Sequence, residues 1–140
     1  MERTPDDEAL LSVARLVMDV SVRAAEELGG LSPVQLRALT ALRGRSGLNL
    51  AQLAEEMGVT VSTASRLVDR LVTAGWVHRG PSPHTRREIS LGLTDVGRGV
   101  LREYDDGRVA GLRACLDTLP PERRAAVVGA FAQFAEATRS

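Results

Sequence analysis

Small polar side chains followed by arginines between residues 60 and 70 have the types and the spacing needed to contact double-stranded DNA. On a helix they share the face opposite Leu67 and Leu71, with the small residues at the N-terminal end. A helix that enters the major groove, about 12 Å wide, needs small side chains there for close approach, and Arg, Ser or Thr to reach base edges and phosphates. The alternative is a solvated face on which Arg66 pairs with Asp69. The candidate DNA-binding residues of this segment are Thr60, Ser62, Thr63, Ser65, Arg66 and Arg70.

A second basic element follows in the segment from about residue 77 to residue 93. Val77 to Arg79 is predicted to form a short strand, and Gly80-Pro81-Ser82-Pro83-His84 a turn-rich tip. The returning strand is predicted from the alternation of Ile89, Leu91 and Leu93 with Glu88, Ser90 and Gly92. On such a β-wing, Arg86 and Arg87 form a second basic group, which would flank the same duplex and reach its narrow minor groove.

The candidate recognition helix, about residues 61–74, follows two short predicted helices. Each of these begins with a capping box, Ser32 with Gln35 and Asn49 with Gln52. Gly58 and Thr60 then mark a tight turn before the recognition helix, because glycine ends helices and threonine caps them. Two helices joined by one tight turn predict a helix-turn-helix. Together with the hairpin they predict a winged helix-turn-helix at residues 31–93, in a protein that is mainly α with a small β-wing.

Helices predicted at residues 4–28 and 94–138 flank the winged segment. The first begins at Thr4 and Pro5 and carries two apolar stripes, whereas a lone amphipathic helix needs only one. Thr94 caps the next helix, and the last one, which starts at Pro120-Pro121, carries both phenylalanines of the chain. The surplus of apolar surface predicts a partner subunit, so these are the predicted dimerisation helices of a homodimer. The candidate interface residues are Leu10, Val13, Val17, Val127, Phe131 and Phe134.

Composition and charge narrow the class of protein. The 140 residues predict a single domain, 1–140, and 18 acidic residues balance 18 basic ones, all of them arginine. The balance is uneven, because residues 1–30 hold three arginines and seven acids whereas residues 31–93 hold eight arginines and four acids. One cysteine and two histidines supply neither a disulfide framework nor a structural zinc site, so we expect no metal and no cofactor.

Other features argue against an enzyme and against a membrane protein. The sequence has no nucleophile-base constellation, phosphate-binding glycine loop or paired carboxylate motif. No apolar run approaches the roughly 18 residues of a membrane span, and the acidic start MERTPDDEAL is unlike a signal peptide, so we expect a cytoplasmic protein. Trp76 is predicted to be a core plug beneath the wing, and Cys115, on the apolar side of its helix, an inert structural thiol.

The stretch LNLAQLAEEMGVTVSTASRLVDRLVTAGWVHR, followed by RREISLGLTDVG, closely resembles the MarR family of bacterial winged helix-turn-helix regulators. The LA-x-x-M-G-V-T turn, the S-R-L-V-D-R-L run, the A-G-W-V-x-R strand and the L-T-x-x-G after the wing occur in the order and spacing of that family. These motifs cover residues 31–97, and the order of helices extends the resemblance to the whole chain.

The resemblance implies a homodimeric repressor whose first and last helices interlock, and which a small phenolic or aromatic carboxylate ligand releases from a pseudo-palindromic operator. It places the Thr60-capped helix in the major groove and Arg87 in the minor groove, with Arg86 at a phosphate or in solvent. The family usually has an Asp two positions before the wing arginine, where it orients the guanidinium, and this chain has Thr85. The sequence identifies neither the effector nor its pocket. The alternative is a winged-helix dimer that has lost DNA binding and acts as a protein-interaction or ligand-binding module.

Overall fold

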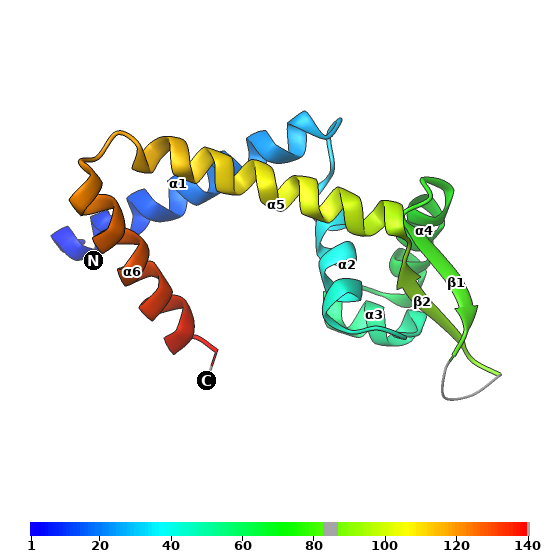
Figure 1. Cartoon of the computed structure of the whole chain (residues 1–140). Coiled ribbons are helices and arrows are strands. Elements are labelled where there is room, and N and C mark those ends of the chain that lie inside the picture. The colour runs from blue at the N-terminus through cyan, green and yellow to red at the C-terminus, as the bar shows by residue number, and fades with distance from the viewer. Residues whose placement is uncertain (83–86, 140) are drawn as a thin grey trace. The chain divides into compact units, whose positions relative to one another are not determined.

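The computed structural model describes residues 1–82 and 87–139. Within these ranges the chain is mainly helical, with one small antiparallel sheet of two strands (Figure 1). This confirms the predicted fold class, a winged helix-turn-helix with further helices before and after it. In chain order the elements are α1 (Pro5–Glu27), α2 (Pro33–Gly44), α3 (Leu50–Met57), α4 (Val61–Thr73), β1 (Val77–Pro81), β2 (Ile89–Leu93), α5 (Asp95–Leu116) and α6 (Pro121–Ala137).

Both predicted capping boxes are present. At the start of α2, the Ser32 hydroxyl accepts a hydrogen bond from the Gln35 N–H at 3.1 Å, and Gln35 Oε1 accepts one from the Ser32 N–H at 3.0 Å. Asn49 and Gln52 form the same reciprocal pair at the start of α3, with distances of 2.8 and 2.9 Å. Each box satisfies N–H groups that the first helical turn leaves without a partner, so local sequence fixes where α2 and α3 begin.

Residues 58–60 form the tight turn between α3 and α4. Gly58 has a φ of +67°, in the left-handed region that glycine adopts without a steric clash, and its N–H donates to the Ala54 carbonyl. Thr60 then caps α4, since its hydroxyl oxygen accepts a hydrogen bond from the Thr63 N–H at 3.1 Å. The predicted helix-turn-helix is therefore present as α3 and α4.

The wing is the hairpin of β1 and β2, whose antiparallel register runs from Val77 opposite Leu93 to Pro81 opposite Ile89. Leu91 also binds outside the hairpin, because its N–H donates to the Leu48 carbonyl at 2.7 Å. The predicted alternation is wrong at two positions, because Ile89 is 62% exposed and Ser90 is buried, whereas Leu91 and Leu93 are buried as expected. Ile89 pairs at the end of the ladder farthest from Val77, beyond the strand residues that belong to the core.

The chain divides into two compact units. The winged unit comprises residues 22–105, and the helical unit comprises residues 1–21 and 106–140, so α1 and α5 each contribute to both. The winged unit contains the hydrophobic core, in which Leu39, Leu53 and Leu71 have no exposed surface. This core joins α2, α3, α4, both strands and the first half of α5.

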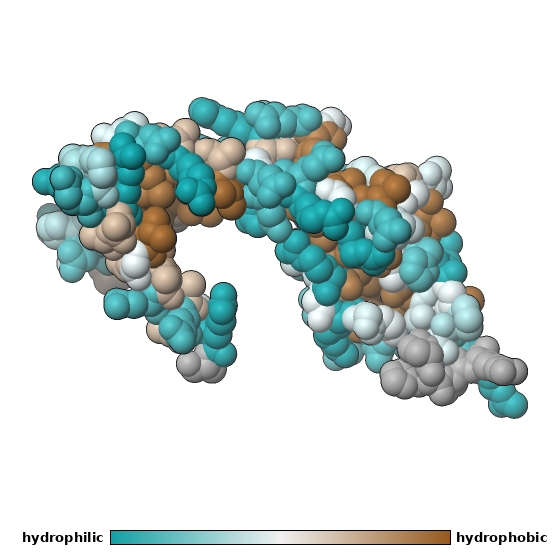
Figure 2. All heavy atoms as spheres, in the orientation of Figure 1, coloured by the Kyte–Doolittle hydropathy of each residue, from teal (hydrophilic) through white to brown (hydrophobic). Residues whose placement is uncertain are grey.

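The helical unit is held by fewer buried contacts. Val20 of α1 is buried where it packs on Gly111 of α5, so closely that a Cβ on Gly111 would lie 3.0 Å from Val20 Cγ1. In α6, every residue of which is described, none is buried. Figure 2 shows apolar surface, coloured brown, where α5 ends and α6 begins. Among the described helices, none is long and apolar enough to cross a membrane.

Candidate nucleic-acid interface

The recognition helix α4 presents two different faces. The face that packs into the core consists of Ala64, Leu67, Val68 and Leu71. The opposite face carries the predicted DNA-binding residues, of which Ser62, Thr63, Arg66 and Arg70 are exposed, Thr60 is exposed at the helix start and Ser65 is half-buried. Residues four apart lie on the same side of a helix, so Arg66 and Arg70 project together, one turn apart. Small hydroxyl side chains therefore come first along this face and cations follow.

The hydroxyl groups of Thr60 and Thr63 at the start of α4 contribute to the helix cap, and one of them still has a hydrogen-bond donor for an external group. The Thr60 hydroxyl, which accepts the Thr63 N–H, itself donates to Thr63 Oγ1 at 2.9 Å. Within the described part of the chain Thr63 Oγ1 donates to no other group, so its own proton is available to an external acceptor. A guanine O6 or N7, or a phosphate oxygen, is an acceptor of the required kind.

Arg66 and Arg70 are the uncommitted cations of this face. Among the residues that the structure describes, neither guanidinium group forms a hydrogen bond or an ion pair. Asp69, the acidic residue of α4, is paired with Arg79 of β1. The structure therefore differs from the alternative in which Arg66 pairs with Asp69, because the wing strand brings another arginine to that carboxylate. The spacing in the sequence indicates only a pair between Arg66 and Asp69. The observed pair of Asp69 with Arg79 depends on how the hairpin packs on α4.

A hollow of about 330 Å³ lies beside the two arginines, between α4 and the start of α2. Ser32, Val34 and Gln35 line it from the α2 side. Helix N-termini carry partial positive charge, and α2 has no acidic residue in its first turn, so this neighbour makes the surface beside Arg66 and Arg70 more electropositive. The sequence did not identify these three residues as neighbours of the interface, because its pattern shows only the capping box of Ser32 and Gln35, and tertiary packing brings the segment to α4.

Of the two arginines predicted to bind DNA from the wing, Arg86 and Arg87, the structure describes one. Arg87 is exposed and directly precedes Glu88, whose carbonyl accepts the Ser82 N–H at 2.8 Å, so the hairpin backbone is closed just beside it. Arg86 and Thr85 lie outside the described residues, as does His84. Their predicted roles therefore stay predictions from the sequence.

The predicted dimer-interface residues all lie in the helical unit, where most of them are exposed. Leu10 of α1 is 65% exposed and Phe134 of α6 is 67% exposed. Val13, Val17 and Phe131 are also exposed, and Val127 is half-buried. Large apolar side chains on two helices are thus left uncovered within a single chain.

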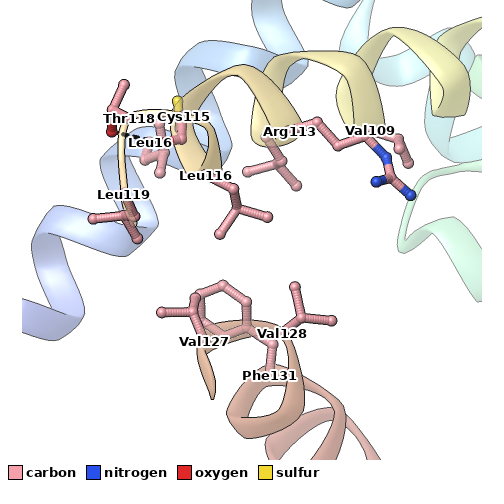
Figure 3. Close-up of a pocket in the computed structure, with 11 residues that line it drawn as sticks. Leu16, Val109, Arg113, Cys115, Leu116, Thr118, Leu119, Val127, Val128 and Phe131 are labelled. Atoms are coloured by element: carbon pink, nitrogen blue, oxygen red, sulfur yellow. Dashed lines mark hydrogen bonds between the residues drawn. The ribbon is translucent and has the colours of Figure 1, made fainter. Parts of the chain in front are cut away.

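An apolar hollow of about 450 Å³ occurs in the same unit, lined by side chains of α1, α5 and α6 and of the turn between α5 and α6. Figure 3 shows Leu116 of α5 and Phe131 of α6 on opposite walls. Cys115 lines the hollow and is half-buried, so this thiol is less enclosed than its predicted structural role implies. Trp76, by contrast, packs against the core of the winged unit, as predicted. No group of three or more His, Cys, Asp or Glu among the described residues is placed to hold a metal ion.

Comparisons with known proteins point to one family. A family model described as the MarR family matches residues 29–88. The chain is 31% identical over 114 residues to the HTH-type transcriptional repressor MdtR of Bacillus subtilis. The aligned region covers 81% of this chain and 74% of MdtR. It spans 61% of the length of another curated relative, to which it is 33% identical over 98 residues.

Solved structures extend the likeness to nearly the whole chain. RV1404 from Mycobacterium tuberculosis is 34% identical with a TM-score of 0.80, over 98% of this chain and 96% of that one. Sco3205, a MarR family transcriptional regulator from Streptomyces coelicolor solved in complex with DNA, is 28% identical with a TM-score of 0.56, over 98% of this chain and 94% of that one. These relatives are named as transcriptional regulators and not as enzymes. On the family model and the match to MdtR, the chain belongs to the MarR family.

Proposed function

We propose that the protein is a DNA-binding transcriptional regulator that reads DNA sequence with the exposed face of α4. The observation that carries the proposal is the pair of uncommitted arginines, Arg66 and Arg70, on a helix whose first turn presents small side chains. Because Asp69 is held by Arg79, it does not neutralise them. In the major groove, arginine reaches guanine O6 and N7, and hydroxyl groups reach base edges or phosphates. The DNA complex of Sco3205 supports this use of the fold.

In this proposal the winged helix-turn-helix of residues 31–93 supplies every contact with DNA. Thr60, Ser62, Thr63, Ser65, Arg66 and Arg70 face the major groove. Arg87, exposed at the wing, reaches the minor groove, where a narrow groove concentrates negative potential and attracts arginine. Arg86 is assigned to a phosphate or to solvent from its place in the sequence.

We also propose a homodimer formed through α1, α5 and α6, the helices of residues 4–28 and 94–138. It is supported by the exposed Leu10, Val13, Val17, Phe131 and Phe134, by the hollow that Val127 helps to line, and by the absence of any buried residue along α6. Burying a large apolar side chain contributes roughly 1.5–3 kcal/mol, so covering these residues with a second copy favours association. A two-fold dimer predicts a pseudo-palindromic operator with half-sites about 10 base pairs apart.

We propose that the regulator is a repressor of bacterial transcription and acts in the cytoplasm, where the DNA lies. The printed name of MdtR, a transcriptional repressor, supports this direction of control. Release by a small aromatic ligand rests on the family resemblance, and we assign that ligand to no described cavity.

The test is the binding of DNA from the promoter region upstream of the protein's own gene, measured at low and at physiological salt. We expect affinity to fall by roughly 10³-fold or more over that range, because arginine contacts with phosphates release counterions. Replacing Arg66 and Arg70 together by Ala should abolish binding, whereas Arg102→Ala, which removes one positive charge at an exposed position on α5, should not. Equal binding by both variants, or no binding at either salt, would favour the alternative of a winged-helix dimer that has lost DNA binding.

A further inference from the structure

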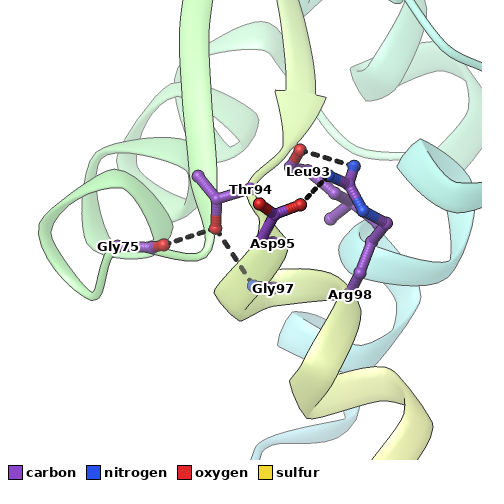
Figure 4. Close-up of polar contacts among 6 residues, drawn as sticks. All are labelled: Gly75, Leu93, Thr94, Asp95, Gly97 and Arg98. Atoms are coloured by element: carbon purple, nitrogen blue, oxygen red, sulfur yellow. Dashed lines mark hydrogen bonds and ion pairs between the residues drawn. The ribbon is translucent and has the colours of Figure 1, made fainter.

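Thr94, the residue between β2 and α5, joins the end of the recognition helix to the start of α5 (Figure 4). Its N–H donates to the Trp76 carbonyl at 3.0 Å, and its hydroxyl donates to the Gly75 carbonyl at 2.6 Å. The same hydroxyl oxygen accepts a hydrogen bond from the Gly97 N–H at 3.0 Å and so caps α5. One side chain therefore bonds to both helices at once.

The two carbonyls that Thr94 binds belong to the motif that ends α4. Gly75 has a φ of +79°, and its N–H donates to the Val72 carbonyl at 3.0 Å. The Trp76 N–H donates to the Leu71 carbonyl at 3.0 Å, which closes the last turn of the helix. Since residues 75 and 76 are bonded into the end of α4, a bond to their carbonyls holds the recognition helix itself.

Gly97 allows the first turn of α5 to pack directly on this point. A Cβ on Gly97 would lie 2.1 Å from the Trp76 carbonyl oxygen, a separation that no side chain tolerates. Gly99, two residues further along, is different, because a Cβ there would meet only Arg102 Nη2 at 3.8 Å. Between these two positions only 97 requires glycine, because the first turn of α5 approaches the backbone of Trp76, just after α4, so closely.

The first half of α5 is fixed to the winged unit at further points. Arg98 donates to the Leu93 carbonyl at 3.0 Å and pairs with Asp95 (Figure 4). Leu101 is 1% exposed within the core. Asp105 accepts a hydrogen bond at 2.8 Å from Arg43, in the last turn of α2. Residues 94–105 are thus bonded or packed onto the winged unit along their whole length, and the same helix then continues to Leu116 in the helical unit.

We propose that Thr94 and Gly97 are positioning residues for DNA recognition, which set the half-site spacing that the dimer accepts. They fix the direction of α4 against α5, the helix that leads from the winged unit toward the proposed dimerisation surface. Once one half-site is bound, the second binding event is intramolecular, and its strength depends on how well the second recognition helix is held at the required place. The inference rests on the proposed function, since it needs a DNA-binding dimer.

The experiment compares a whole operator with half of it. A duplex of about three helical turns, selected by the wild-type protein from a random-sequence library, is used intact, cut to one half-site, and lengthened at its centre by one or two base pairs. Thr94→Val removes the hydroxyl while keeping the shape of the side chain. We expect its affinity for the half-site to stay within about twofold of wild type, its affinity for the whole operator to fall about tenfold, and its penalty for the lengthened operators to shrink.

Matched variants separate this role from a general loss of structure. Thr94→Ser keeps the hydroxyl and should restore wild-type spacing discrimination. Gly97→Ala should act like Thr94→Val or more strongly, whereas Gly99→Ala should leave both affinities unchanged. Thr118→Val removes the same kind of bond, from a threonine hydroxyl to the Cys115 carbonyl at 2.7 Å, beyond the other end of α5, and should also be silent. Sedimentation should show that every variant has the oligomeric state of the wild type.

Equal losses on the half-site and on the whole operator, or an unchanged spacing penalty in Thr94→Val, would overturn the positioning role. So would a Thr94→Val protein that fails to fold, because the bond would then serve the fold as a whole. Failure of the wild-type protein to select any duplex would instead overturn the proposed function. The two failures are therefore distinguishable.

Discussion

The winged unit and the helical unit differ in where their apolar side chains go. In the winged unit Leu39, Leu53 and Leu71 have no exposed surface, and the polar face of α4 is left free. In the helical unit no residue of α6 is fully buried, and large apolar side chains of α1 and α6 are exposed. The winged unit thus has a core of its own and an exposed polar surface on α4, whereas the helical unit has an exposed apolar surface on α1 and α6.

This difference shows that an apolar stripe in a sequence predicts burial but does not distinguish burial within the same chain from burial against a partner chain. The apolar residues of α4 and of α1 have similar helical spacing, and the stripe of α4 is enclosed by its own chain. In α1, by contrast, Leu10, Val13 and Val17 stay exposed. A second copy would complete the helical unit, and DNA would meet the winged unit.

The largest effect is expected from removing apolar surface in the helical unit. Phe131→Ser together with Phe134→Ser should convert the proposed dimer to monomer at micromolar concentration, because each phenylalanine contributes roughly 1.5–3 kcal/mol when buried. Over the symmetric interface this raises the dissociation constant by more than about a thousandfold. Sedimentation equilibrium measures the change.

The control is Ile89→Ser, which replaces an apolar side chain that is 62% exposed on β2 of the winged unit. It should leave the oligomeric state unchanged, because that surface has no proposed partner chain. A wild-type protein that is already a stable, folded monomer at micromolar concentration would contradict the proposed dimer and remove the basis of the comparison.

The next effect tests the core of the winged unit. Leu71→Ala should lower the free energy of unfolding by about 2–5 kcal/mol, since it deletes a fully buried side chain and leaves a cavity. Urea denaturation followed by circular dichroism measures this loss, and Val96→Ala should change stability by less than about 0.5 kcal/mol. A loss below about 1 kcal/mol for Leu71→Ala would mean that the core is not what stabilises this unit.

Much of the winged unit could be predicted because its signals are local. The capping boxes, the turn at Gly58 and the spacing of Leu67 and Leu71 each act within a few residues, so the sequence contains the whole cause. The family resemblance likewise rests on motifs inside this segment. The fold class and the exposed face of α4 follow from such local rules.

What could not be predicted depends on contacts between distant residues. Asp69 has Arg66 three positions away in the sequence, but the register of the hairpin delivers Arg79 to it. The L-T-x-x-G motif was visible, yet the reason for Gly97 is a carbonyl at Trp76 that only packing brings within 2.1 Å of a Cβ. Ile89 follows the strand alternation and is still exposed, because alternation does not say where the covering helices end.

A smaller effect is expected from single replacements on the polar face of α4. Arg66 lies nearer the N-terminus of α4 than Arg70, so we expect Arg66 to contact bases and Arg70 the DNA backbone. Arg66→Ala should reduce discrimination among operator variants by roughly 1–3 kcal/mol, while Arg70→Ala should weaken binding to all sequences alike. Affinities for a panel of single-base operator variants provide the measurement. Identical specificity profiles for the two variants would show that this division of roles is wrong.

The smallest effect concerns the start of α1, in the helical unit. Asp7 Oδ2 accepts a hydrogen bond from the Thr4 N–H at 2.8 Å, and the Thr4 hydroxyl accepts one from the Asp7 N–H at 3.2 Å. The backbone N–H of Thr4, helped by a hydrogen bond with the Thr4 side chain, lowers the pKa of Asp7 below the usual value for an aspartate. A lowered pKa in the folded chain means that this contact stabilises α1 above the usual aspartate pKa, and that the contribution disappears as pH falls through the folded-state pKa.

Because this cap is local, the hydrogen bonds between Thr4 and Asp7 should form whether or not a second copy covers the helical unit. Thr4→Ala removes the hydroxyl but keeps the backbone N–H, so the pKa of Asp7 should rise only part of the way to the usual value. NMR titration of the Asp7 carboxyl carbon measures it. The same titration on the variant with both Phe131→Ser and Phe134→Ser should give the wild-type pKa, since the Thr4 to Asp7 bonds lie within one helical turn. If the pKa of Asp7 instead rises when the dimer is lost, then the second copy also orders the start of α1. The helical unit would then depend on its partner even for a local helix cap, unlike the winged unit.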